Sequence, residues 1–286
     1  MLKAAEKRRL SSLVHDALKT KPEVRPFPAA VAQLLAACQD PNANAARFEK
    51  IITLDPALAV RLLRMANSPL YGLASEVRSV SHAVAILGIR QLRSLAMSVA
   101  GAGMFAQGKT ASIERAELWS HSLGCATVAR LLAATVPGVS AEDSFLAGIF
   151  HDVGKLFLLD VVPAEYNDMS MHCFGDDLAR EEQFVFDITH EEIGLRSAHA
   201  WKLNESLKVA IGYHHRPTET PLNPELVRVI HAADLLARQW GIGSSQHDFP
   251  DYDATLADFN LSIAAADDWK QRSQEIFSDT MLAISG

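Results

Sequence analysis

Residues 147–160 of the chain, AGIFHDVGKLFLLD, carry the information that decides its fold. They place His151 and Asp152 side by side, with apolar residues before and after them at the spacing of a helix. Two polar side chains in such a setting are costly to bury unless something satisfies them. A divalent metal ion would do so, because imidazole and carboxylate are both suitable ligands. A solvated helix end with a hydrogen bond between the two side chains is the alternative interpretation.

The apolar residues on both sides of this stretch also recur at helical spacing, and strand-like alternation is scarce. Asp55 is suited to cap a helix that has Pro56 at its first position. Pro69 predicts the end of that helix, since the residue before a proline avoids helical geometry. Thr189 and Glu192 have the spacing of a capping box. The pattern predicts an all-α fold.

Two further helices can be delimited. One starts at Ser79 or Ser81 and meets Gly88, which is expected to break or cap it. The other opens at Asn223 and Pro224.

Composition narrows the possible functions. The chain has 286 residues, 49% hydrophobic and 21% charged, which is enough for one large domain or two tightly packed ones. Its net charge of −7 gives little support to nucleic-acid binding. Three cysteines without CxxC spacing indicate neither disulfides nor a zinc knuckle. We find neither a signal peptide nor a run of about 18 apolar residues, and therefore expect a cytoplasmic protein without a membrane span.

Two composition shifts predict boundaries, near residues 101–113 and 241–253. The predicted parts are an N-terminal helical extension (1–20), an N-terminal helical subdomain (21–105), a second helical subdomain (106–240) and an acidic C-terminal helical extension (241–286). Residues 246–286 hold eight acids against Lys270 and Arg272. One helical face of this segment is expected to dock on the body, and it consists of Trp269, Ser273, Ile276, Thr280 and Ile284.

Other polar residues lie in apolar helical contexts. His121 lies on a largely apolar helix, where a satisfied core histidine is the simplest interpretation. His190 lies at a helix start, where a surface role would be ordinary, and His214-His215 follow an apolar helix. Asp234 lies in the middle of an apolar helix, and a salt bridge to an arginine is an alternative to metal binding there.

The order H…HD…H…HH…D resembles that of the HD phosphohydrolase superfamily, whose members hold one or two divalent metal ions. The resemblance implies that His121, His151, Asp152 and Asp234 form the core site. It also implies that three further histidines, His190, His214 and His215, add a second metal in binuclear members. Iron, manganese, zinc and nickel would all suit such ligands.

The N-terminal half resembles the HDOD family more specifically. The similar segments are RPFPAAVAQLLAAC (25–38), residues 51–72 with Asp55-Pro56 and Asn67-Ser68, and residues 77–97 up to and beyond Leu87-Gly88. With HDVGKL, HEEIG and IHAADLLA downstream, the resemblance covers residues 21–240. It implies an N-terminal helical subdomain packed on an HD-like helical subdomain.

Two functions follow from this resemblance. The first is a bacterial signal-transduction output module that binds a signalling protein or a small phosphate-containing ligand. The alternative is a metal-dependent phosphohydrolase, in which Asp152 holds the metal and Lys155 stabilises developing negative charge. Enzymes of the superfamily that cleave cyclic di-GMP carry a Gly-Tyr-Pro loop after their His pair, whereas RPTETPLNP follows His215 here. This departure argues against that particular hydrolysis.

Overall fold

The computed structural model describes residues 4–21, 24–38, 40, 43–106 and 113–285. Within these ranges the secondary structure consists of helices without a strand, which confirms the all-α prediction. The boundary predicted near residues 101–113 falls partly outside the described residues, since 107–112 are not among them. Residues 101–106 continue a helix.

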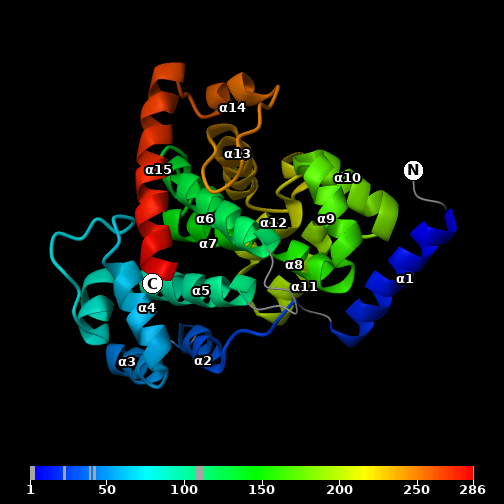
Figure 1. Ribbon diagram of the computed structural model, residues 1–286. Coiled ribbons are helices and arrows are strands. Elements are labelled where there is room, and N and C mark those ends of the chain that lie inside the picture. The colour runs from blue at the N-terminus through cyan, green and yellow to red at the C-terminus, as the bar shows by residue number, and fades with distance from the viewer. Residues whose placement is uncertain (1–3, 22–23, 39, 41–42, 107–112, 286) are drawn as a thin grey trace.

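The helices follow the chain as Figure 1 shows. The first five are α1 (Ala4–Thr20), α2 (Ala29–Cys38), α3 (Ala45–Thr53), α4 (Pro56–Ala66) and α5 (Val80–Ala106). The next eight are α6 (Ile113–Ala133), α7 (Ala141–Phe150), α8 (Val153–Val161), α9 (Pro163–His172), α10 (Gly175–Phe186), α11 (His190–Ala200), α12 (Glu205–Tyr213) and, after the 3-10 turn Pro217–Glu219, α13 (Pro224–Trp240). The last two are α14 (Tyr252–Asp258) and α15 (Ile263–Ser285).

Local sequence signals set several helix ends. The side chain of Asp55 accepts a hydrogen bond from Leu58 N at 3.0 Å, and Pro56 is the first residue of α4. The helix that was expected to open at Asn223 and Pro224 begins at Pro224. Asn223 does not cap it, because its backbone is left-handed (φ 49°) and its side chain donates to Ser206 Oγ instead.

Helix α5 is the central helix of the N-terminal half. Ser79 Oγ accepts a hydrogen bond from His82 N at its start. Gly88 breaks it as expected, with φ 73° and ψ 171°, a conformation essentially restricted to glycine. By length and composition α5 would also be able to span a membrane, but 61% of its most apolar window is buried inside the protein. We therefore interpret it as a core helix.

The N-terminal helices pack directly on the helices that carry the histidines, as the family resemblance implies. Helix α5 contacts α2, α3 and α4, and it also contacts α6 and α7. Just before α2, the ring of Phe27 lies 4.7 Å from that of Trp201 and 5.8 Å from that of Phe150. Val24 N donates to Ser197 Oγ at 3.0 Å. The division points after residues 20, 105 and 240 stay a prediction.

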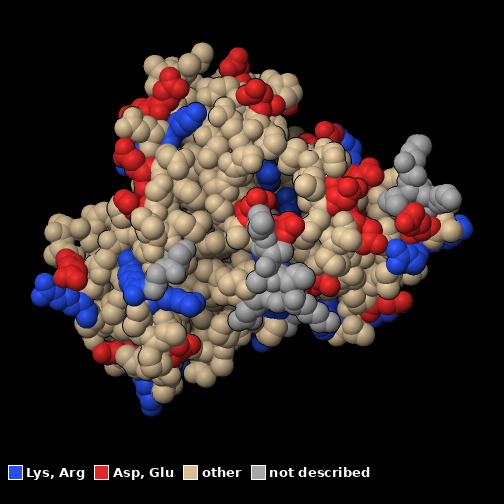
Figure 2. Space-filling model, viewed as in Figure 1, with Lys and Arg blue, Asp and Glu red and all other residues tan. Residues whose placement is uncertain are grey.

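The two ends of the chain cover different parts of the molecule (Figure 1). Helix α1 packs on α8 and α10, whereas α15 runs along α4 and α6 and so bridges both halves. The predicted docking face of α15 is confirmed, because Ser273 and Thr280 are fully buried and Trp269 and Ile276 pack against the core. Figure 2 shows acidic side chains along the outer edge of this region.

Candidate metal centre

The HD pair lies in the turn between two buried helices. His151 directly follows α7 and Asp152 directly precedes α8. The carboxylate of Asp152 does not cap α8, so it is free to face the neighbouring helices. Gly154 lets those helices approach, because a Cβ there would lie 2.0 Å from the carbonyl oxygen of His190. Helix α8 therefore meets the start of α11 backbone to backbone.

The other histidines are positioned by helix ends. His190 is the first residue of α11, and the capping box of Thr189 and Glu192 fixes that end, as the spacing predicts. His214 and His215 follow α12 directly. His121 comes from the middle of α6 and Asp234 from the middle of α13.

The structure brings all seven predicted metal ligands into one buried cluster. Their exposed fractions are His121 3%, His151 0%, Asp152 1%, His190 0%, His214 0%, His215 7% and Asp234 6%. His190 is fully buried, so the surface position considered for it is wrong. Whether the cluster binds metal stays a prediction, but the convergence across helices that are distant in sequence is a finding.

The cluster divides into two sets of candidate ligand atoms. The first set is His121, His151 and Asp234. His121 Nε2 lies 2.8 Å from Asp234 Oδ1, and His151 Nε2 lies 3.7 Å from the same oxygen.

The second set is Asp152, His190, His214 and His215. Asp152 Oδ1 lies 3.3 Å from His190 Nε2 and 3.7 Å from His214 Nε2, and these two nitrogens are 3.3 Å apart. Ligand bonds of about 2.0–2.1 Å to a tetrahedral ion imply separations of roughly 3.3–3.4 Å between ligand atoms. Two of the three separations in the second set match this spacing, and the third, 3.7 Å, is slightly longer.

Three histidines of the second set have their other ring nitrogen engaged. His190 Nδ1 donates to Glu182 Oε2 at 2.7 Å. His214 Nδ1 donates to the carbonyl oxygen of Ile211 at 3.0 Å, and His215 Nδ1 to Asp176 Oδ1 at 3.0 Å. In a neutral ring this leaves each Nε2 unprotonated and directed toward the other ligands, as metal-binding histidines require.

Several buried atoms of the cluster have no hydrogen-bond partner among the described residues. They include Asp152 Oδ1, His151 Nε2 and His215 Nε2. Such atoms are costly to bury unsatisfied. A divalent ion coordinated by Asp152 Oδ1 and His215 Nε2 would satisfy two of these atoms. The residues of the second set therefore fit a metal ion.

Two cations of the chain itself lie inside the cluster. Lys155 Nζ is 2.7 Å from Asp152 Oδ2. Arg238 Nε is 3.0 Å from Asp234 Oδ1, and its Nη2 is 2.9 Å from His121 Nε2. The alternative of an arginine salt bridge at Asp234 is therefore realised. Lys155, which would stabilise negative charge in the phosphohydrolase alternative, is only 5% exposed and pairs with Asp152.

Burial and neighbouring charges shift the pKa values of the cluster. Burial and the charge of Arg238 lower the pKa of His121 to about 4. Burial and Lys155 hold the pKa of His190 well below its ordinary value. Burial raises the pKa of Glu182 to about 7, although Tyr166 donates to it at 2.6 Å. Neutral His121 and His190 are the forms that a metal ion requires.

The residues that hold the ligands in place were not predicted from the sequence. Glu182 is fully buried, and it also accepts a hydrogen bond from His190 N at 2.7 Å. In the sequence it stands within the run REEQ, which resembles a solvated helix face. Arg238 had a detectable signal, since it follows Asp234 by four residues, a spacing at which helical side chains meet.

This helical fold with its buried His/Asp cluster is of the HD type. A family model for the HDOD domain matches residues 24–217, more than half of the chain, and the chain belongs to the HDOD family. It is similar to the solved HDOD domain protein with unknown function from Geobacter sulfurreducens, with 26% identity, coverage of 97% of this chain and 93% of that one, and a TM-score of 0.71.

Two further likenesses are more limited. A candidate metal-dependent phosphohydrolase from Shewanella amazonensis SB2B is 19% identical with a TM-score of 0.72, over 96% of this chain and 99% of that one, which shows a shared fold alone. An uncharacterized protein from Treponema pallidum (strain Nichols) is 27% identical over 220 residues, 74% of this chain. The chain spans 41% of the length of that curated relative.

Proposed function

We propose that this HDOD chain is a signalling output module that acts by binding a partner, and that its HD-like half holds a divalent ion for structural reasons. Burial of the cluster is the observation that carries this proposal. None of the seven candidate ligands is more than 7% exposed. A phosphoester has to reach the ion and be positioned beside it for hydrolysis to occur. The alternative of a phosphohydrolase would require the helices around Asp152 to open.

The two internal cations support the same proposal. In a phosphohydrolase, a lysine or arginine of the site stabilises negative charge that develops on the substrate. Here Lys155 and Arg238 are already paired with Asp152 and Asp234. The role that the phosphohydrolase alternative gives Lys155 would require this buried ion pair to break, which is strongly unfavourable.

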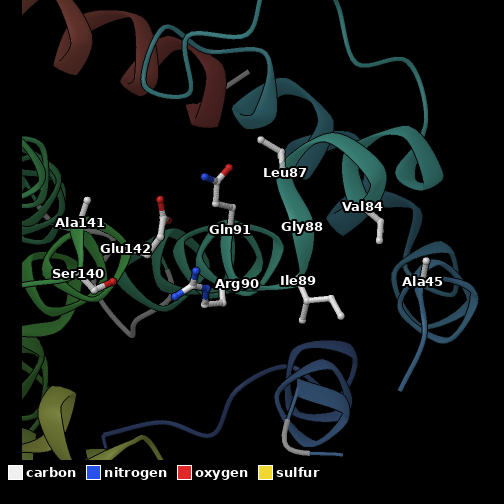
Figure 3. A pocket seen from close by; sticks show the side chains of 10 residues that line it. All are labelled: Ala45, Val84, Leu87, Gly88, Ile89, Arg90, Gln91, Ser140, Ala141 and Glu142. Atoms are coloured by element: carbon white, nitrogen blue, oxygen red, sulfur yellow. The ribbon is translucent and has the colours of Figure 1, made fainter. Parts of the chain in front are cut away.

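The surface around the kink of α5 supports binding by the N-terminal helices. A groove of about 630 Å³ lies there, lined by Ala45 at the start of α3, by residues 84 and 87–91 of α5 and by residues 140–142 at the start of α7 (Figure 3). It combines apolar side chains such as Ile89 with the charged Arg90 and Glu142. We propose a signalling protein or a small phosphate-containing ligand as the partner, in the cytoplasm, where the free cysteines 38, 125 and 173 would stay reduced.

A substrate panel tests the proposal. Metal-free chain is reloaded with Mn²⁺, Fe²⁺ or Zn²⁺ and assayed against phosphomonoesters, phosphodiesters, nucleotides and cyclic di-GMP. We expect the rates to equal those of the Asp152→Ala variant. Metal-dependent hydrolysis that disappears in Asp152→Ala would establish the phosphohydrolase alternative and refute the proposal.

A further inference from the structure

The first ligand set contains a guanidinium where the family resemblance places a metal ion. Arg238 reaches it from α13, one helical turn after Asp234. Its Nε lies 3.0 Å from Asp234 Oδ1, and its Nη2 lies 2.9 Å from His121 Nε2 and 3.6 Å from Asp152 Oδ2. The guanidinium thus contacts three of the four core residues with its own donor atoms.

This arrangement engages two of the three ligand atoms of the first set, His121 Nε2 and Asp234 Oδ1, whereas His151 Nε2 has no hydrogen-bond partner among the described residues. An imidazole nitrogen has either one lone pair or one proton to offer, and His121 Nε2 already lies 2.9 Å from Arg238 Nη2 and 2.8 Å from Asp234 Oδ1. An arginine cannot lose its proton in a protein, so the donor does not become an acceptor. Arg238 is only 9% exposed, so departure from the site would require a charged side chain to move through packed helices.

The second set differs in that no guanidinium from the described part of the chain engages its ligand atoms Asp152 Oδ1 and His215 Nε2. Asp152 Oδ1 and His215 Nε2 have no hydrogen-bond partner among the described residues. The separations of its ligand atoms, 3.3 to 3.7 Å, leave a position for a small ion between them. Lys155 pairs with the other oxygen of Asp152, Oδ2, and leaves Oδ1 available.

The balance of charge favours one ion over two. Five carboxylates belong to the two sets or contact them: Asp152, Asp234, Glu182, the half-exposed Asp176 and Glu191, which accepts a hydrogen bond from His215 N. Lys155, Arg238 and Arg216 offset three of these charges. With Glu182 ionised, one divalent ion offsets the remaining two charges, whereas a second ion would leave an excess positive charge in a buried site, which is costly.

We propose that Arg238 takes the place of the first metal ion, and that the chain binds a single divalent ion, held by Asp152, His190, His214 and His215. This inference deepens the proposed function, since it concerns the same metal centre and rests on the proposal that the centre holds an ion. In this chain, the position of the superfamily's core metal ion is then occupied by the internal ion pair of Arg238 and Asp234. The divalent ion is then bound by Asp152 together with the three histidines that were expected only to add a second metal.

Metal stoichiometry tests the proposal without an activity assay. The full chain is stripped of metal, titrated with Co²⁺ or Zn²⁺, passed over a desalting column and analysed for metal by mass spectrometry. We expect one ion per chain in the wild type and two in Arg238→Met, which removes the charge and keeps an apolar stem. Arg228→Met, at a partly exposed position of the same helix outside both ligand sets, is the matched control and should bind one ion.

Two histidine variants give an independent readout that does not require Arg238→Met to fold. His121→Ala should still bind one ion with an unchanged Co²⁺ absorption spectrum, because His121 belongs to the first set. His190→Ala should bind none tightly. Two ions in the wild type, loss of the ion in His121→Ala, or a wild type that binds none would each overturn the inference. None of these results depends on hydrolysis. Failure of this inference can therefore be distinguished from failure of the proposed function, which the substrate panel tests.

Discussion

His190 donates two hydrogen bonds to the same oxygen of Glu182: its backbone N and its ring Nδ1 each lie 2.7 Å from Oε2. Glu182 therefore fixes the start of α11 and the orientation of the imidazole at once. Such carboxylate–histidine pairs raise the basicity of the ligand and set its tautomer. The other oxygen of Glu182 accepts from Tyr166, which holds the carboxylate itself in place.

Replacing Glu182 should weaken the metal site without removing a ligand. In Glu182→Gln one acceptor oxygen is lost and an amide takes its place, so the ring of His190 is held less well. We expect the affinity for Zn²⁺ to fall about 10- to 100-fold, measured by competition with a chromophoric chelator. Glu181→Gln, one position away, should leave the affinity unchanged. Equal affinities in all three proteins would show that Glu182 does not support the ligand.

Adding one methyl group at Gly154 should disrupt the contact between α8 and α11. A Cβ there would lie 2.0 Å from His190 O, a backbone atom that cannot move alone. We expect Gly154→Ala to lower the free energy of unfolding by roughly 1–3 kcal/mol or more, measured by urea denaturation. Gly103→Ala in α5 is the control, because a Cβ there meets no atom within 4 Å among the described residues outside its own helix backbone. It should be neutral or stabilise by up to about 1 kcal/mol. A neutral Gly154→Ala would contradict the observed packing.

Gly88 should resist substitution for a different reason. A Cβ there meets no atom within 4 Å, but the backbone has φ 73° and ψ 171°. A side chain in that region costs on the order of 1–3 kcal/mol. We expect Gly88→Ala to destabilise the chain by that amount while metal content stays the same, because none of the candidate ligands lines the groove at the kink. A loss of metal equal to that of His190→Ala would contradict this separation of the two regions.

Acid should destabilise the metal-free chain in part through His121. Its pKa of about 4 lies below the ordinary 6.5, so the folded state binds the proton less well than the unfolded state. The stabilising contribution is complete above about pH 6.5 and is lost as pH falls toward 4, to a total of about 3 kcal/mol. Urea midpoints at pH 7 and pH 4.5 should therefore differ less in His121→Gln than in the wild type. Parallel curves for the two proteins would refute the assignment.

Much of the fold could be predicted from the sequence because its signals are local. Asp55 and Pro56 start α4, the capping box at Thr189 starts α11, and Gly88 breaks α5, as expected. Each signal depends on a few neighbouring residues and on backbone geometry.

Which cation lies among the clustered histidines and aspartates could not be predicted in the same way. The order of histidines and aspartates indicated which side chains would meet, but not which cation would lie among them. An ion or an arginine would both satisfy Asp234, and only the position of α13 against α6 brings Arg238 to His121. Glu182 was missed because its burial depends on α10 packing beside α11 and α9, which a charged run does not reveal.

The most direct test of the central claim is whether phosphate reaches the bound ion. The chain is loaded with Co²⁺, and its visible absorption is recorded while inorganic phosphate is added, with metal content checked after gel filtration. If the ion is structural and closed off, the spectrum should stay unchanged and the cobalt should stay bound. A saturable change of the spectrum with full retention of cobalt would show that phosphate binds the ion, and it would contradict a structural role.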